Sequence, residues 1–114
     1  MYFVKVDAGN ESLHFGDFKP VVAEEADKAP NGYVRIHYWY MFSNGFGASV
    51  DRNEFSYGGC DGLFELAVAD SSYNIRYDTP IARGAIGRLT EKEVVEILEK
   101  IETLPPREEL EVED

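Results

Sequence analysis

The sequence has little cysteine and no long apolar run, and each shortage excludes a class of protein. Cys60 is the only cysteine in 114 residues, so neither an intramolecular disulfide nor a thiolate metal cluster can form within one chain. Such cysteine usage is typical of the reducing cytoplasm. No apolar run approaches the roughly 20 residues that span a bilayer, and Met1 to Asp7 lack the long apolar region of a signal peptide. We therefore expect a cytoplasmic protein without contact to a membrane.

Basic residues are also scarce. Lysine and arginine total 11 against 22 acidic residues, which gives a formal net charge of −11. Such a surface repels phosphate backbones and disfavours direct nucleic-acid binding. Two interpretations stay open: the acidic excess keeps the protein soluble, or it imitates a nucleic-acid backbone and occupies a nucleic-acid-binding protein. The second interpretation predicts a partner with a basic surface.

Length and composition indicate one folded domain. The hydrophobic content of 44% and the aromatic content of 13% are those of a folded chain, and the many tyrosines and phenylalanines favour β-strands. We expect a single α+β domain over residues 1–106. An acidic, flexible tail is expected over residues 107–114.

The predicted sheet is an antiparallel β-meander of four to five strands. Its clearest landmark is Asn44-Gly45, which favours a two-residue type I′ turn because both residues tolerate positive φ. Both faces of segment 33–42 carry large apolar side chains, so we expect this strand to be covered on both sides over much of its length. Residues 24–27 are expected to form one helical turn. Strand-like segments occur at residues 2–6, 19–23, 33–42, 46–50, 63–70 and 75–78.

One helix is predicted from Thr90 to Leu104, packed on one face of the sheet. Thr90 and Glu93 have the spacing of a capping box, and Gly84 and Gly87 are expected to bend the connection that precedes them. The apolar stripe at helical spacing comprises Val94, Ile97, Leu98, Ile101 and Leu104. The solvent side of this helix carries Glu96, Glu99 and Glu102.

No motif names a reaction, and we expect no catalytic residue, cofactor or metal. The glycine-rich loop 58–62 is followed by a strand rather than by the helix N-terminus that a phosphate site needs. Cys60 lies beside Asp61, which opposes the low pKa that a nucleophilic thiolate needs. His14 and His37 lack the spacing of a metal pair. A small hydrolase with a metal or ligand in a cleft remains a weak third hypothesis.

Acidic and aromatic residues are the candidates for partner binding. Besides the three helix glutamates, acids occur around the glycine loop at Asp51, Glu54 and Asp61. Trp39 and Tyr57 are the aromatic candidates, because aromatic side chains are enriched at binding hot spots. Each of them has an equally simple interpretation as ordinary sheet packing. Binding through the acids should depend strongly on salt, whereas binding through Trp39 and Tyr57 should not.

An ordered set of motifs resembles small acidic proteins encoded by bacteriophages and prophages, most of them without an assigned activity. The resemblance covers Asn44 to about Pro105, and it departs from the pattern at Arg83-Gly84-Ala85 and in the segment before residue 33. The motifs are NGFGASV (44–50), SYGG (56–59), GLFELAV (62–68), YDTPI (77–81) and GRLTEKEV (87–94).

The resemblance implies a non-enzymatic phage accessory protein. Small acidic phage proteins often bind and inhibit host machinery, so we expect an inhibitor of a host protein, such as an anti-CRISPR or another anti-defence protein, acting as a monomer or homodimer. The alternative is a structural or assembly component of a phage particle or replication complex that acts through self-association. The family supplies no catalytic residues.

Overall fold

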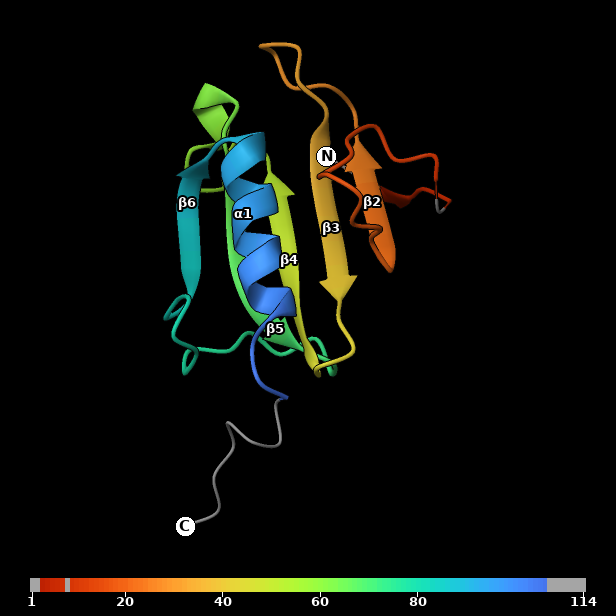
Figure 1. The fold of residues 1–114 in the computed structure, drawn as a ribbon. Helices are drawn as coiled ribbons and strands as arrows, with labels where there is room; N and C mark the ends of the chain where they lie inside the picture. The colour runs from red at the N-terminus through yellow and green to blue at the C-terminus, as the bar shows by residue number, and fades with distance from the viewer. Residues whose placement is uncertain (1–2, 8, 107–114) are drawn as a thin grey trace.

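The computed structural model describes residues 3–7 and 9–106 and contains one antiparallel sheet with one helix on a face (Figure 1). The order of the strands across the sheet is the order along the chain, and every neighbouring pair is antiparallel. The predicted α+β meander with a C-terminal helix is confirmed. The elements are β1 (Val4–Lys5), β2 (Val22–Ala26), β3 (Arg35–Met41), β4 (Phe46–Arg52), the short 3₁₀ helix η1 (Gly59–Asp61), β5 (Phe64–Asp70), β6 (Ala85–Leu89) and α1 (Glu91–Glu102).

The sheet has six strands rather than four to five, and the last of them is not where we predicted it. Segment 75–78 forms only an isolated bridge between Ile75 and Ala69. The strand that pairs with β5 is β6, within the stretch we expected to be a bent connection. Gly87 interrupts the strand pattern there, and Arg88 has a φ of 57° at an irregular step of the register. These two residues obscure the strand signal.

The predicted helical turn at residues 24–27 is also wrong. Glu24 and Glu25 continue β2, opposite His37 and Ile36 of β3, and β1 pairs with the other edge of the same strand. Glutamate has a good helix propensity, but pairing on both edges of the strand overrides it. The sheet therefore extends two strands beyond the long β3–β4 hairpin.

The β3–β4 hairpin is confirmed, although its loop has three residues rather than two. The Phe42 N–H donates to the Phe46 carbonyl at 2.8 Å, and Gly45 alone of the loop has a positive φ, 88°. This is a turn closed by a glycine in the left-handed region, as in three-residue hairpins. The Asn44 amide donates instead to the carbonyls of Ile101 at 2.8 Å and Leu104 at 3.1 Å. With the Glu102 carbonyl at 3.3 Å, Asn44 thus contacts three carbonyls at the end of α1 and just beyond it.

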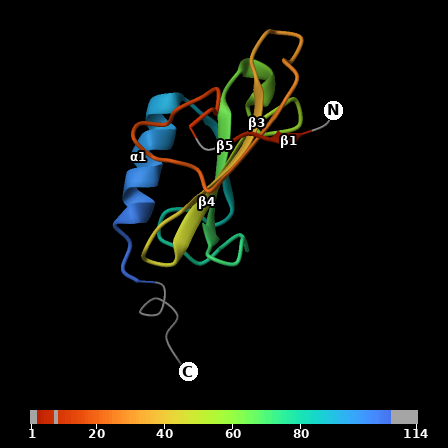
Figure 2. The same ribbon diagram turned by 90° about the vertical axis from the view of Figure 1, so that its right-hand side faces the viewer.

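The core lies between the sheet and α1. Thr90 caps the helix as predicted: its hydroxyl accepts from the Glu93 N–H at 3.2 Å, while the Glu93 carboxylate accepts from the Thr90 N–H at 2.9 Å. Val94, Leu98 and Ile101 are fully buried in α1. The helix contacts β4, β5 and β6, and Figure 2 shows it on one side of the sheet.

The segment before β2 contributes to this core. Phe15 is fully buried, and its ring meets those of Tyr38, Tyr40 and Phe64 edge-on, the last at a centroid distance of 5.0 Å. Edge-to-face contacts of this kind add to the burial of the rings. The irregular chain before β2 therefore packs on the same side of the sheet as α1.

Strand β3 is covered fully on one side and partly on the other. Ile36, Tyr38 and Tyr40 are buried in the core, where Phe15 of the N-terminal segment packs on both tyrosines, whereas His37 and Trp39 on the other side are only half-buried. The helix is the only one longer than a single turn among the described residues, so the second face has no helical layer. We call this second side of the sheet the far face.

Candidate partner-binding surfaces

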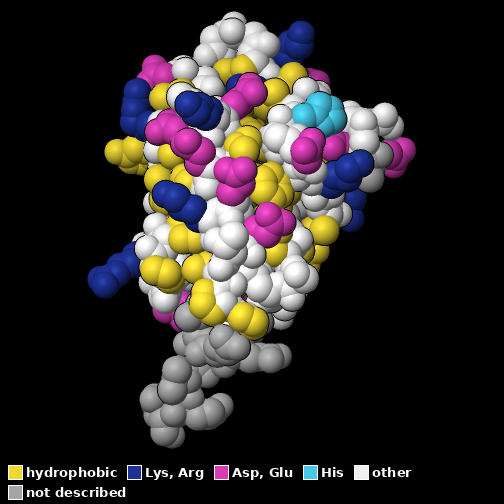
Figure 3. Space-filling model, in the orientation of Figure 1, with side chains coloured by type: hydrophobic (Ala, Val, Ile, Leu, Met, Phe, Trp, Pro, Cys, Tyr) yellow, Lys and Arg dark blue, Asp and Glu magenta, His cyan; other side chains and the backbone are white. Residues whose placement is uncertain are grey.

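The three predicted helix acids lie on the exposed side of α1. Glu96, Glu99 and Glu102 are exposed, and within residues 3–7 and 9–106 none of them has an ion pair. Figure 3 shows acidic side chains spread over this side of the molecule, with basic ones among them. The helix acids are therefore available to a partner.

A groove runs between α1 and the chain segment before β2. It has a volume of about 360 Å³. Its apolar part comes from Phe18 and Val95, both half-buried, and its acidic part from exposed Asp17, Glu99 and Glu102. We call it the helix groove. Its lining is completed by Gly16, whose φ of 58° turns the chain toward the helix.

The acids predicted around the glycine loop are already paired. Both oxygens of Glu54 accept from the Arg35 guanidinium, which lowers the pKa of the Glu54 carboxyl to about 2. Asp61 lies 2.9 Å from Arg88, with both side chains more than half exposed. These two carboxylates carry less free charge toward a partner than the helix acids do.

Asp51 belongs to a row of charged side chains on the far face that was not predicted from the sequence. Glu24, His37, Asp51 and Glu65 lie directly opposite one another on β2, β3, β4 and β5. We call these four residues the charged row. The register of four strands brings it together, and no spacing along the sequence signals it.

The charged row holds three carboxylates and one imidazole. His37 Nδ1 lies 3.5 Å from the nearer oxygen of Asp51 and 3.9 Å from that of Glu24. The Glu65 carboxylate accepts from the Tyr57 N–H at 3.2 Å. Burial raises the pKa of the Asp51 carboxyl to about 6; Glu65 and Glu24 add to this effect, and His37 opposes it. The row is thus rich in negative charge.

The two aromatic candidates lie close to the charged row. Trp39 follows His37 on the same side of β3, with ring centroids 5.4 Å apart, and the Tyr73 ring meets Trp39 edge-on at 5.1 Å. Tyr57 is 66% exposed. Its ring lies against the backbone of Gly87, where a Cβ would come within 2.1 Å of it. A glycine in β6 therefore lets the Tyr57 ring lie close over the sheet next to Glu65.

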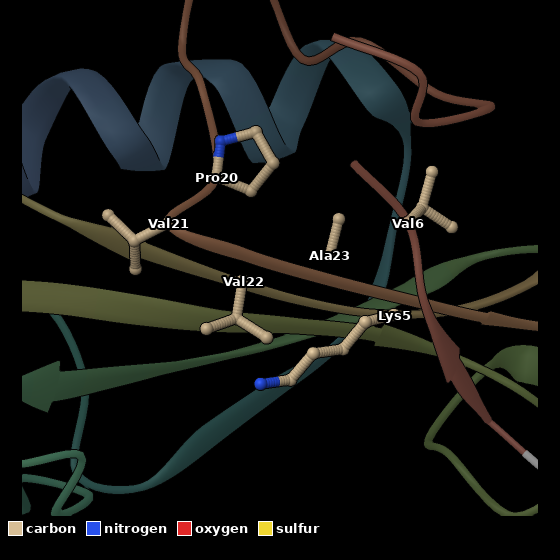
Figure 4. Close-up of a pocket in the computed structure, with 6 residues that line it drawn as sticks. All are labelled: Lys5, Val6, Pro20, Val21, Val22 and Ala23. Carbon is tan, nitrogen blue, oxygen red and sulfur yellow. The ribbon is translucent and has the colours of Figure 1, made fainter. Parts of the chain in front are cut away.

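Two further observations on the described residues concern metal ions and small ligands. Among residues 3–7 and 9–106, no group of three or more His, Cys, Asp or Glu side chains can hold a metal ion. A pocket between β1 and β2 measures only about 90 Å³ (Figure 4), well below the several hundred cubic ångströms of ligand sites. Its lining comprises Lys5, Val6, Pro20, Val21, Val22 and Ala23.

The comparisons add no relative from which a role could be inferred. No family model matches this chain, and no curated protein or solved structure matches it either. Over the described residues, no helix has the length and apolar character needed to cross a membrane. The fold and surfaces therefore define an antiparallel α+β domain with two acidic faces: the helix groove and the charged row.

Proposed function

We propose that this chain is a non-enzymatic phage accessory protein that binds a basic host protein in the bacterial cytoplasm and inhibits it. The proposed class is an anti-CRISPR or another anti-defence inhibitor. The observation that carries the proposal is the helix groove, where Asp17, Glu99 and Glu102 surround an apolar patch of Phe18 and Val95. The motif resemblance to small acidic phage proteins supplies the biological setting.

The helix groove suits lysine or arginine side chains of a partner. Such side chains lay their aliphatic stems along apolar surface and keep the charged head in polar surroundings. Phe18 and Val95 offer the apolar surface, and the carboxylates beside them offer the counter-charge. Because the net charge is −11, long-range attraction also raises the rate of encounter with a basic surface. A partner that normally binds nucleic acid would be blocked by occupation of that surface.

The test is a pull-down from bacterial lysate at 50 mM and 500 mM NaCl, with the captured proteins identified by mass spectrometry. We expect a nucleic-acid-binding protein that is retained at low salt and released at high salt. The variant Glu99→Gln/Glu102→Gln should lose it. The variant Asp7→Asn/Asp27→Asn removes the same charge from exposed positions outside the groove and should retain it. If the amount of captured protein changed neither with the salt concentration nor in the Glu99→Gln/Glu102→Gln variant, the proposal would be refuted.

The assembly alternative has less support from the sheet edges. Self-association of sheets usually proceeds through a long, flat edge strand. Here β1 has only two residues, and β6 has an irregular register and a residue with positive φ, Arg88. Light scattering separates the two functions, since a stable higher oligomer would favour assembly and a monomer or dimer would favour the inhibitor.

A further inference from the structure

We propose that the far face is a second docking surface, where an arginine side chain of a partner protein lies against Asp51 and Glu65 of the charged row. This inference goes beyond the proposed function, since it concerns the opposite side of the sheet and does not require the helix groove. The arginine would approach from solvent, with Tyr57 beside its guanidinium.

The first argument is the unbalanced charge of adjacent strands. Asp51 and Glu65 are directly opposite on β4 and β5, so their Cβ atoms are about 5 Å apart. Like charges in that position destabilise a sheet. His37 lies on the other side of Asp51, and within the described residues Glu65 has no ion pair. A cation between the two carboxylates would relieve the repulsion.

The second argument is the shape of the surroundings. Tyr57 is exposed, and its N–H holds the Glu65 carboxylate. Its ring lies against the backbone of Gly87, which has no side chain, and the residue keeps 66% of its surface exposed to a partner. A guanidinium has five donors in a planar fork, which can serve two carboxylates at once, and it stacks on aromatic rings. A lysine ammonium is a point charge without this planar match, so the row favours arginine.

A second copy of this chain fits the far face poorly. Each copy would bring the three carboxylates and one imidazole of the charged row, with Lys5 opposite Glu24 as the only lysine or arginine of the described residues that the strand register pairs with one of them. A two-fold dimer brings the same patch of both copies into contact, so the patch must be complementary to itself. Here the carboxylates of one copy would face those of the other and repel them. An arginine-bearing partner removes this repulsion, whereas a dimer through the far face would increase it.

The proposed contact should weaken in acid. The groups that face Asp51 are Glu24 from β2, His37 from β3 and Glu65 from β5, while Lys5 lies beyond them, opposite Glu24. Because burial and the neighbouring carboxylates raise the pKa of Asp51 to about 6, it takes up a proton as the pH falls through that value. Protonation of Asp51 removes negative charge from the row, so the affinity for arginine should fall between pH 7.5 and pH 5.

The experiment titrates the full chain with the peptide acetyl-Gly-Gly-Arg-Gly-Gly-amide, followed by NMR. Trp39 is the only tryptophan, so its indole N–H signal reports on the far face directly. We expect shifts of that signal and of the amides of residues 37, 51 and 65. The matched peptide with neutral citrulline in place of arginine should leave them unmoved.

Paired variants separate this surface from the helix groove. Asp51→Asn/Glu65→Gln should weaken arginine-peptide binding about fivefold, which corresponds to roughly 1 kcal/mol, while Glu99→Gln/Glu102→Gln should leave the far-face shifts unchanged. Both variants remove two charges, and thermal unfolding checks that each is folded. Equal shifts with citrulline, unchanged binding by the far-face variant, or a dimer that buries the Trp39 indole would each overturn the inference. Loss of lysate capture in the helix-groove variant alone would leave it intact.

Discussion

The two faces of the sheet carry residues of opposite character on the same strands. On β3, Ile36, Tyr38 and Tyr40 are almost completely buried, while His37 between them keeps 34% of its side chain exposed. On β4, Val50 is fully buried and its neighbour Asp51 keeps 23% of its side chain exposed. The alternation of the strand thus separates two roles. The face under α1 stabilises the fold through apolar burial, and the far face holds charge that costs stability.

A matched pair of truncations should show the difference most strongly. Val50→Ala removes two methyl groups from a site with 0% exposure under α1, and should lower the free energy of unfolding by about 2 to 3 kcal/mol. Val22→Ala removes the same groups from the far face, where Val22 is half-buried opposite Trp39, and should cost less than about 1 kcal/mol. Urea unfolding of both variants measures the two losses, and equal losses would contradict the assignment of the faces.

The second comparison tests the cost of charge on the far face. The pKa of the Asp51 carboxyl rises from 3.8 to about 6 on folding, so the folded state binds the proton more tightly than the unfolded chain. Stability from this group is therefore present below about pH 4 and is lost as the pH rises through 6, by up to about 3 kcal/mol. Asp51→Asn removes this penalty. We expect the variant to be more stable than the wild type at pH 8, with an advantage that shrinks toward pH 4.

Glu54 provides a control of opposite sign for the pH experiment. The Arg35 guanidinium lowers the pKa of the Glu54 carboxyl from 4.5 to about 2. Its stabilisation is present above about pH 4.5 and is lost as the pH falls toward 2. Glu54→Gln should therefore reduce stability at pH 8, where Asp51→Asn increases it. If both variants changed stability in the same direction at that pH, the electrostatic explanation of the far face would be wrong.

The sequence predicted the covered face better than the far face, because the two depend on different information. The capping box at Thr90 and the apolar stripe of α1 depend only on residues that are close in the sequence, so the sequence alone predicts them. The charged row depends on the register of β2, β3, β4 and β5. The sequence predicts a helical turn that includes Glu24 and Glu25, and without β2 the row cannot be predicted. Strand β6 was missed because Gly87 and Arg88 break its pattern.

A smaller effect is expected from loss of the cap that begins α1. Thr90→Ala removes the hydroxyl that accepts from the Glu93 N–H and should cost about 1 kcal/mol. Because α1 covers only one face of the sheet, this loss should leave the far face unaltered, so the Trp39 indole signal should not move. Thr103→Ala, at the other end of the helix, removes only a local bond to the Lys100 carbonyl and serves as the control. If Thr103→Ala lowered the free energy of unfolding as much as Thr90→Ala does, a specific role for the capping box would be contradicted.

The smallest effect on stability should come from the helix acids, and it sharpens the comparison of the two acidic surfaces. Glu99 and Glu102 are exposed and lack ion pairs within residues 3–7 and 9–106, so Glu99→Gln/Glu102→Gln should change the free energy of unfolding by less than about 0.5 kcal/mol. The equal charge change Asp51→Asn/Glu65→Gln should stabilise the protein at pH 8. If both double variants raised the free energy of unfolding by the same amount, the stabilisation would come from the lower net charge alone. A gain confined to the far face would show that local repulsion in the charged row is the cause, because the two variants carry the same net charge.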